Sequence, residues 1–218
     1  MKLLLTSAGI ANPSLVSALL KLVGKPFKQA GLVFIPTASN VEEGDKGWLI
    51  DDLVNLKQLD FASVDIVDIS ALPKEIWLPR IKEADVLVFS GGNTFHLMSW
   101  LRKSGLDIML PELLKNKVYV GISAGSMVVS KSIFLTSDKP IFDENRLGVT
   151  DDTGLGLVDF YIRPHFNSPY FPKAKEEAIV EAAKKVSEPI FALDDNSAVL
   201  VNENKAEIVS EGEWKKFN

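Results

Sequence analysis

The 218-residue sequence contains no cysteine, which excludes disulfide bonds, thiolate metal ligands and a cysteine nucleophile. It also lacks a long apolar run, since the apolar segment at residues 1–5 is far too short for a signal peptide or a membrane span. With 29 Asp and Glu against 24 Lys and Arg, it has no excess of basic residues and no basic stripe for nucleic acid. We therefore expect a soluble, cytoplasmic protein that binds neither nucleic acid nor a membrane.

Short apolar runs alternate with amphipathic stretches over the first 122 residues, which is typical of a parallel sheet flanked by helices. The runs are rich in Val, Ile, Leu and Phe, as in strands that are buried on both faces. The expected strands are 3–6, 31–36, 64–69, 86–90 and 118–122, and the expected helices are 14–23, 46–59, 76–84, 94–104 and 111–116.

The pattern changes after the fifth strand, because residues 131–155 show weak periodicity and predict loops. The later expected elements are a strand at 158–162, a helix at 173–185 and short strands at 190–193, 198–201 and 206–209, the last two forming a hairpin. No linker or repeat divides the sequence. We predict one α/β domain over residues 1–218, with a mostly parallel sheet, helices on both faces and a small C-terminal hairpin.

A G-x-S-x-G motif occupies residues 121–125 and centres on Ser123, directly after the expected strand 118–122. The glycines allow a sharp backbone reversal, and the N–H groups at the start of the following helix favour developing negative charge. The motif predicts Ser123 as a nucleophile, although a simple strand-to-helix turn has the same composition. Ser126 is the rival hydroxyl, but it lies about one turn into the expected helix.

A serine nucleophile needs a base, and the chain offers only His96 and His165. His165 follows the expected strand 158–162, and active sites of open α/β sheets gather at strand carboxyl ends. His96 lies inside the expected helix 94–104. We therefore take His165 as the base; the alternative is a loop histidine bonded to the backbone. With two unpaired histidines and no cysteine, we expect no metal and no organic cofactor.

The segment Ser-Gly-Gly-Asn-Thr at residues 90–94 also follows a strand and opens a helix. Glycines there let backbone N–H groups approach a substrate oxygen. We interpret the N–H groups of Gly92 and Ala124 as an oxyanion hole and Asn93 as a substrate-binding residue. The alternative is a tight turn in which Asn93 or Thr94 caps the helix.

Two segments offer a carboxylate to orient the imidazole of His165. Asp138 lies in an irregular segment, whereas Asp195 follows the expected strand 190–193. We expect that strand to end beside those that precede Ser123 and His165. A rigid element orients a side chain better than a loop does, so we favour Asp195.

Taken together, these motifs resemble the peptidase E family of aspartyl dipeptidases, a serine variant of the class I glutamine-amidotransferase-like, flavodoxin-like three-layer fold. The matching stretches are GGNTF at 91–95, YVGISAG at 119–125 and PHF at 164–166, with weaker matches at 34–36 and 138–141. The resemblance implies Ser123 as nucleophile, His165 as base and oxyanion donors near Gly92 and Ala124. It allows either Asp138 or Asp195 as the third member; at the second position the dipeptidases have glutamate.

The resemblance weakens where the family's dipeptidases bind the substrate aspartate through an arginine on the helix after the histidine. Residues 168–177 contain no arginine, and a lysine cannot copy a bidentate arginine–carboxylate pair. We therefore predict a serine peptidase, monomeric or homodimeric, that cleaves a small dipeptide-like substrate, without assigning Asp-X specificity. The alternatives are an esterase or amidase on the same scaffold and a catalytically silent relative that binds a metabolite or peptide.

Overall fold

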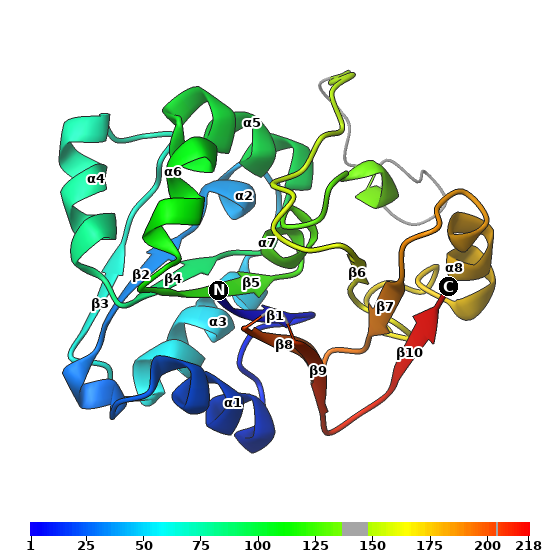
Figure 1. The fold of residues 1–218 in the computed structure, drawn as a ribbon, viewed down its shortest axis with the longest axis horizontal. Coiled ribbons are helices and arrows are strands. Elements are labelled where there is room, and N and C mark those ends of the chain that lie inside the picture. Colours follow the sequence, from blue (N-terminus) through cyan, green and yellow to red (C-terminus); the bar gives the residue numbers. More distant parts are fainter. Residues whose placement is uncertain (137–147, 204) are drawn as a thin grey trace.

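The computed structural model describes residues 1–136, 148–203 and 205–218 and centres on a seven-stranded sheet (Figure 1). Its strands are β1 (Lys2–Thr6), β2 (Gly31–Ile35), β3 (Ser63–Ile66), β4 (Val86–Phe89), β5 (Val118–Ile122), β8 (Ser197–Asn202) and β9 (Lys205–Ser210). Their order is β3-β2-β4-β5-β1-β8-β9. The first five are parallel, and β8 and β9 add an antiparallel hairpin beside β1. The predicted α/β class with a mostly parallel sheet is confirmed.

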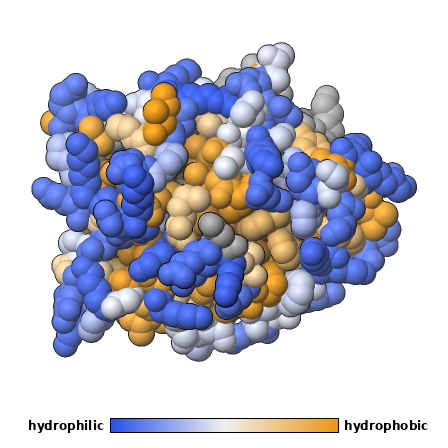
Figure 2. All heavy atoms as spheres, viewed as in Figure 1, coloured by the Kyte–Doolittle hydropathy of each residue, from blue (hydrophilic) through white to orange (hydrophobic). Residues whose placement is uncertain are grey.

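Helices cover both faces of this sheet. The helices of the described residues are α1 (Pro13–Val23), α2 (Thr37–Asn40), α3 (Gly47–Gln58), α4 (Lys74–Glu83), α5 (Thr94–Ser104), α6 (Leu106–Leu113), α7 (Ala124–Met127) and α8 (Glu176–Ala183), with 3-10 turns at Phe27–Gln29 and Phe134–Thr136. Of these, α8 packs against a second sheet and not against the central one. In Figure 1, α1 and α3 lie on one side of the sheet and α4, α5 and α6 on the other. A buried apolar cluster lies on each face of the sheet, and successive strand residues belong to opposite clusters. Leu4 packs in the cluster with α1 and α3, whereas Leu3 packs in the cluster with α4 to α6. Figure 2 shows hydrophilic side chains over much of the outer surface in this view.

Local signals explain where the helices begin and end. Helix α1 begins at Pro13. The preceding residue, Asn12, caps it, because its side-chain oxygen accepts a hydrogen bond from the Leu15 N–H at 3.0 Å. It ends at Gly24, which adopts the left-handed conformation with φ 72°. Gly105, with φ 71°, likewise separates α5 from α6, so α6 begins earlier than expected. In the described residues, each helix is too short or too polar to traverse a lipid bilayer.

A second sheet of three strands stands beside the central one. It contains β6 (Tyr161–Arg163), β7 (Ile190–Leu193) and β10 (Trp214–Phe217) in the order β10-β7-β6, with β6 and β7 parallel. Strand 190–193 therefore ends beside β6, which precedes His165, as expected, but the expectation that it also lies beside the strand that precedes Ser123 is wrong, because β5 belongs to the other sheet. The free side of β1 pairs with β8 instead, so β7 forms the middle of a separate sheet that packs against α8.

Candidate active site

The sharp turn at Ser123 connects β5 to α7. Ser123 has φ 47° and ψ −103°, a conformation that costs about 1–3 kcal/mol and needs support from its surroundings. Its N–H donates a hydrogen bond to the Thr6 carbonyl at 3.1 Å. A Cβ at Gly121 would lie 2.6 Å from the Gly125 oxygen, and one at Gly125 would lie 2.2 Å from the Phe89 oxygen. Both glycines are therefore required for the strand, the turn and the helix to pack together.

The Ser126 hydroxyl is not available at this turn. Ser126 is buried, and its Oγ donates a hydrogen bond to the Thr6 carbonyl at 2.7 Å. It holds α7 against the end of β1, as expected for a serine inside the helix rather than at the apex.

His165 lies between Ser123 and Asp195. Its Nε2 is 2.9 Å from the Ser123 Oγ, and its Nδ1 is 2.7 Å from the Asp195 Oδ1. An ionised carboxylate can only accept a hydrogen bond, so Nδ1 carries the proton and Nε2 accepts the serine hydroxyl. Two elements of the second sheet supply the pair: His165 follows β6, and Asp195 lies between β7 and β8. The structure thus brings three of the four expected residues into one chain of hydrogen bonds.

Asp195 is held in its charged form. Burial alone would raise its pKa, but the hydrogen bond and charge of His165 and the hydrogen bond from Ser7 outweigh burial and lower the pKa below its usual value. A charged carboxylate at this place stabilises an imidazolium and fixes the orientation of the ring.

Two residues that the sequence did not single out support His165. Ser7, just beyond β1, accepts a hydrogen bond from the His165 N–H at 2.8 Å and donates one to the Asp195 Oδ1 at 3.0 Å. Phe171 stacks on the imidazole with ring centroids 4.1 Å apart and an angle of 12° between the planes. These contacts hold a histidine whose φ of 63° is unusual for a residue with a side chain.

The expected oxyanion donors lie at adjacent strand ends. Gly92 has φ 121°, and a Cβ there would lie 2.3 Å from the Ala38 oxygen, so the loop needs glycine. A Cβ at the neighbouring Gly91 would lie 3.4 Å from the Ser123 Cβ, so this loop lies directly against the serine turn. Within the described residues, the N–H groups of Gly92 and Ala124 donate no hydrogen bond. Both are free to bind a substrate oxygen.

With this geometry established, comparison with known proteins gives the family. A sequence model described as peptidase family S51 matches residues 3–209. The chain belongs to peptidase family S51, a family of serine peptidases.

Relatives in several bacteria agree with the S51 assignment. An uncharacterized peptidase of Pasteurella multocida is 32% identical over 185 residues, which cover 82% of this chain and 84% of that protein. The peptidase E of Shewanella sp. strain ANA-3 is 34% identical over 171 residues, covering 76% of this chain and 66% of that one. In fold, the chain is similar to a crystal structure of a candidate peptidase E protein from Listeria monocytogenes EGD-e, with a TM-score of 0.80, 24% identity and coverage of 97% and 98%.

The remaining expected residues of this S51 chain have other positions. Asn93 is only 6% exposed, and its Oδ1 accepts a hydrogen bond from the His96 N–H at 2.9 Å, which caps α5. His96 lies in α5, and burial lowers its pKa. Asp138 lies outside the described residues, so its role stays a prediction. Among the described residues, no group of three or more His, Asp or Glu side chains is arranged to hold a metal ion.

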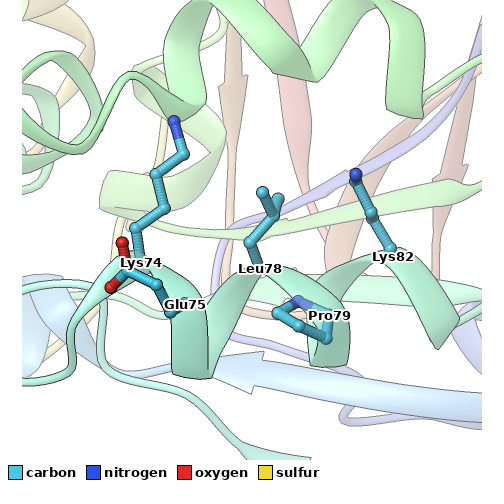
Figure 3. A pocket seen from close by; sticks show the side chains of 5 residues that line it. All are labelled: Lys74, Glu75, Leu78, Pro79 and Lys82. Atoms are coloured by element: carbon cyan, nitrogen blue, oxygen red, sulfur yellow. The ribbon is translucent and has the colours of Figure 1, made fainter.

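A hollow of about 410 Å³ lies on the surface of this S51 chain, away from Ser123. It runs along α4 and is lined by Lys74, Glu75, Leu78, Pro79 and Lys82. Figure 3 shows Lys74, Leu78 and Lys82 pointing to the same side of the helix. None of the residues around Ser123 lines it, so we do not take this hollow as part of the active site.

Proposed function

We propose that this chain is a serine peptidase that hydrolyses small, dipeptide-like substrates through an acyl-enzyme on Ser123. The observation that carries the proposal is the position of His165, with one ring nitrogen 2.9 Å from the Ser123 hydroxyl and the other 2.7 Å from the Asp195 carboxylate. That arrangement is the one needed for a hydroxyl to lose its proton as it attacks a carbonyl.

In the proposed reaction, the Ser123 Oγ attacks the scissile carbonyl carbon while His165 Nε2 takes the hydroxyl proton. The N–H groups of Gly92 and Ala124 bind the resulting oxyanion. When the carbon–nitrogen bond breaks, His165 gives its proton to the leaving amine. Water then attacks the acyl carbon and loses a proton to His165, and when the bond between that carbon and the Ser123 Oγ breaks, His165 returns the proton to Oγ and the acid is released. Throughout these steps Asp195 stabilises the charged imidazole.

The choice of a peptide substrate is supported by the relatives named peptidase E, several of which are 34–35% identical to this chain over more than half of its length. The small size of the peptide follows from the resemblance of the motifs to the peptidase E family of dipeptidases. We do not extend the proposal to substrates that begin with aspartate. The segment from His165 through α8 contains no arginine, and its lysines lack the planar fork that binds a carboxylate in two places.

A covalent label tests the proposal directly. A fluorophosphonate reacts with an activated serine by forming an Oγ–phosphorus bond and releasing fluoride. We expect mass spectrometry to find the adduct on Ser123 in the wild type and in Ser126→Ala, and no adduct in Ser123→Ala. Screening a dipeptide library should then reveal hydrolysis in the same proteins that accept the label. A wild-type protein that neither reacts nor hydrolyses any dipeptide would be a binding protein, and the proposal would be wrong.

A further inference from the structure

Thr6, the last residue of β1, contacts the turn at Ser123 through both its carbonyl and its hydroxyl, and it is fully buried. The carbonyl accepts hydrogen bonds from the Ser123 N–H at 3.1 Å and from the Ser126 Oγ at 2.7 Å. The hydroxyl donates to the Gly121 carbonyl at 2.8 Å and accepts from the Gly9 N–H at 3.0 Å. Thr6 therefore holds the chain before Ser123, at Ser123 itself and after it.

The two partners of the Thr6 hydroxyl fix its direction. A carbonyl can only accept and an N–H can only donate, so the hydroxyl proton points to Gly121 and a lone pair points to Gly9. The bond from the Gly9 N–H closes residues 6–9 into a local turn, a pattern that threonine side chains often form. Gly9 has φ 80°, a conformation that glycine adopts at little cost. Ser7 lies inside this turn.

Ser7 connects the turn at residues 6–9 to the other half of the active site. Its hydroxyl accepts a hydrogen bond from the His165 N–H at 2.8 Å and donates one to the Asp195 Oδ1 at 3.0 Å. The Thr6 hydroxyl donates from the same turn to the residue two positions before Ser123. One end of β1 is thus hydrogen-bonded both to the segment of the nucleophile and to the segments of its base and carboxylate.

The backbone of Ser123 needs support of this kind. Its φ of 47° and ψ of −103° lie in a region that persists only where neighbouring groups hold the chain. The contact between the Ser123 Oγ and the His165 Nε2, at 2.9 Å, depends on this conformation. Relaxation of the turn would move the hydroxyl relative to the ring nitrogen.

We propose that Thr6 is a positioning residue of the active site, whose hydroxyl aligns Ser123 with His165 by joining the turn at residues 6–9 to the turn at Ser123. The inference rests on the proposed hydrolysis at Ser123 and adds a residue that acts on the reaction from inside the protein. Because Thr6 is fully buried, it acts through Ser123 and not on the substrate. Loss of its hydroxyl should therefore slow attack by the serine and leave substrate binding nearly unchanged.

The variant Thr6→Val tests the proposal, because valine keeps the size and branching of threonine and removes the hydroxyl. We expect the fluorophosphonate to label Ser123 about 10- to 100-fold more slowly, since a small misplacement of reacting atoms has a large effect on rate. For a dipeptide that the wild type hydrolyses, kcat should fall to a similar extent while KM changes only a few-fold. Thr6→Ser restores a hydroxyl and should recover most of both rates. All proteins are compared at pH 8, because burial raises the pKa of Asp52, which contacts Gly9, to about 7.

The matched control is Thr37→Val. Thr37 is also fully buried, and its hydroxyl donates to the Asp68 Oδ1 at 2.8 Å. Asn40 donates to the same carboxylate at 2.6 Å, so α2 stays anchored without the threonine hydroxyl. We expect Thr37→Val to lower the melting temperature, as Thr6→Val does, but to keep the labelling rate within a few-fold of the wild type. Equal slowing in the two variants, or no slowing in Thr6→Val, would overturn the proposal.

Crystal structures separate this inference from the proposed function. In Thr6→Val, we expect the fold to be retained and the Ser123 Oγ to lie beyond hydrogen-bond distance of the His165 Nε2. This displacement, found together with a wild type that takes no label, would support the inference and contradict the peptidase. A labelled wild type, with contact and labelling rate both kept in Thr6→Val, would support the peptidase and contradict the inference. If Thr6→Val does not fold, Thr6→Cys replaces it, because a thiol is a weaker donor than a hydroxyl, and wild-type labelling there would overturn the proposal.

Discussion

The backbone N–H of His165 donates a hydrogen bond to the Ser7 hydroxyl at 2.8 Å, although 158 residues separate the two in the chain. The same hydroxyl donates to Asp195, so one serine positions both partners of the imidazole. We expect Ser7→Ala to lower kcat about 10-fold with little change in KM, because the substrate does not contact Ser7 in the proposed reaction. Steady-state kinetics would measure this, with Ser104→Ala as the control, since its hydroxyl bonds only within α5 and the following turn. An equal rise in KM would indicate a role in binding instead.

Asp195 and Asp194 are neighbours with different surroundings. Asp194 accepts hydrogen bonds from the Glu213 N–H at 2.7 Å and the Asn196 N–H at 3.0 Å, which fix the turn after β7. We expect Asp195→Asn to lower kcat by about 10²–10⁴, because an amide neither stabilises the imidazolium nor fixes the ring. In contrast, Asp194→Asn should lower the melting temperature while kcat changes only a few-fold. A larger loss of kcat in Asp138→Asn than in Asp195→Asn would reverse the choice of carboxylate.

Phe171 restrains His165 by stacking on its ring. Without the aromatic ring, the imidazole can rotate away from Ser123, so we expect Phe171→Ala to slow fluorophosphonate labelling about 10-fold. Phe171→Tyr keeps the stacked ring and should restore most of the rate. The adjacent Tyr170 is 85% exposed, so Tyr170→Ala provides the control. Equal rates in Phe171→Ala and Tyr170→Ala would show that the stacking has no effect on reactivity.

The raised pKa of Asp52 makes a prediction about stability. Its pKa is about 7 in the folded protein and 3.8 as the ordinary value, so the folded state retains a proton that the unfolded state loses between these pH values. The contribution of Asp52 to the free energy of unfolding is therefore largest below pH 4. As the pH rises to 8, the wild type should lose up to ~4 kcal/mol of unfolding free energy through this group. Urea unfolding of Asp52→Asn at pH 4.5 and pH 8 should show a much smaller loss. Parallel curves for the two proteins would contradict this assignment.

The central sheet could be predicted from sequence because its strands are continuous apolar runs between turn residues. The second sheet could not, since β10 (Trp-Lys-Lys-Phe) is largely exposed and lacks the pattern of a buried strand. Strand 190–193 was expected correctly, but the sequence does not show which sheet it joins. Strand β8 occupies the free edge of β1, and this pairing joins segments from the two ends of the chain.

Part of the site could likewise be found from sequence. Ser123 could be identified because it lies in a G-x-S-x-G motif, and His165 because the chain has only two histidines. Ser7 and Phe171 carry no motif, and each contacts His165 only because of how the chain folds. Only the position of Ser7 directly after the first strand could have drawn attention, because that strand ends at the same edge as β5.

The three hydrogen-bonded residues Ser123, His165 and Asp195 come from both sheets. Ser123 follows β5 of the central sheet, whereas His165 and Asp195 follow β6 and β7 of the other. A shift of about 1 Å between the two sheets is enough to cost roughly 100-fold in rate, even if each sheet keeps its own hydrogen bonds. Partial opening under mild denaturant should therefore abolish turnover while amide hydrogens in β4 and β5 still resist exchange with solvent. Activity in this protein would report whether the two sheets are docked, and not simply whether the chain is folded.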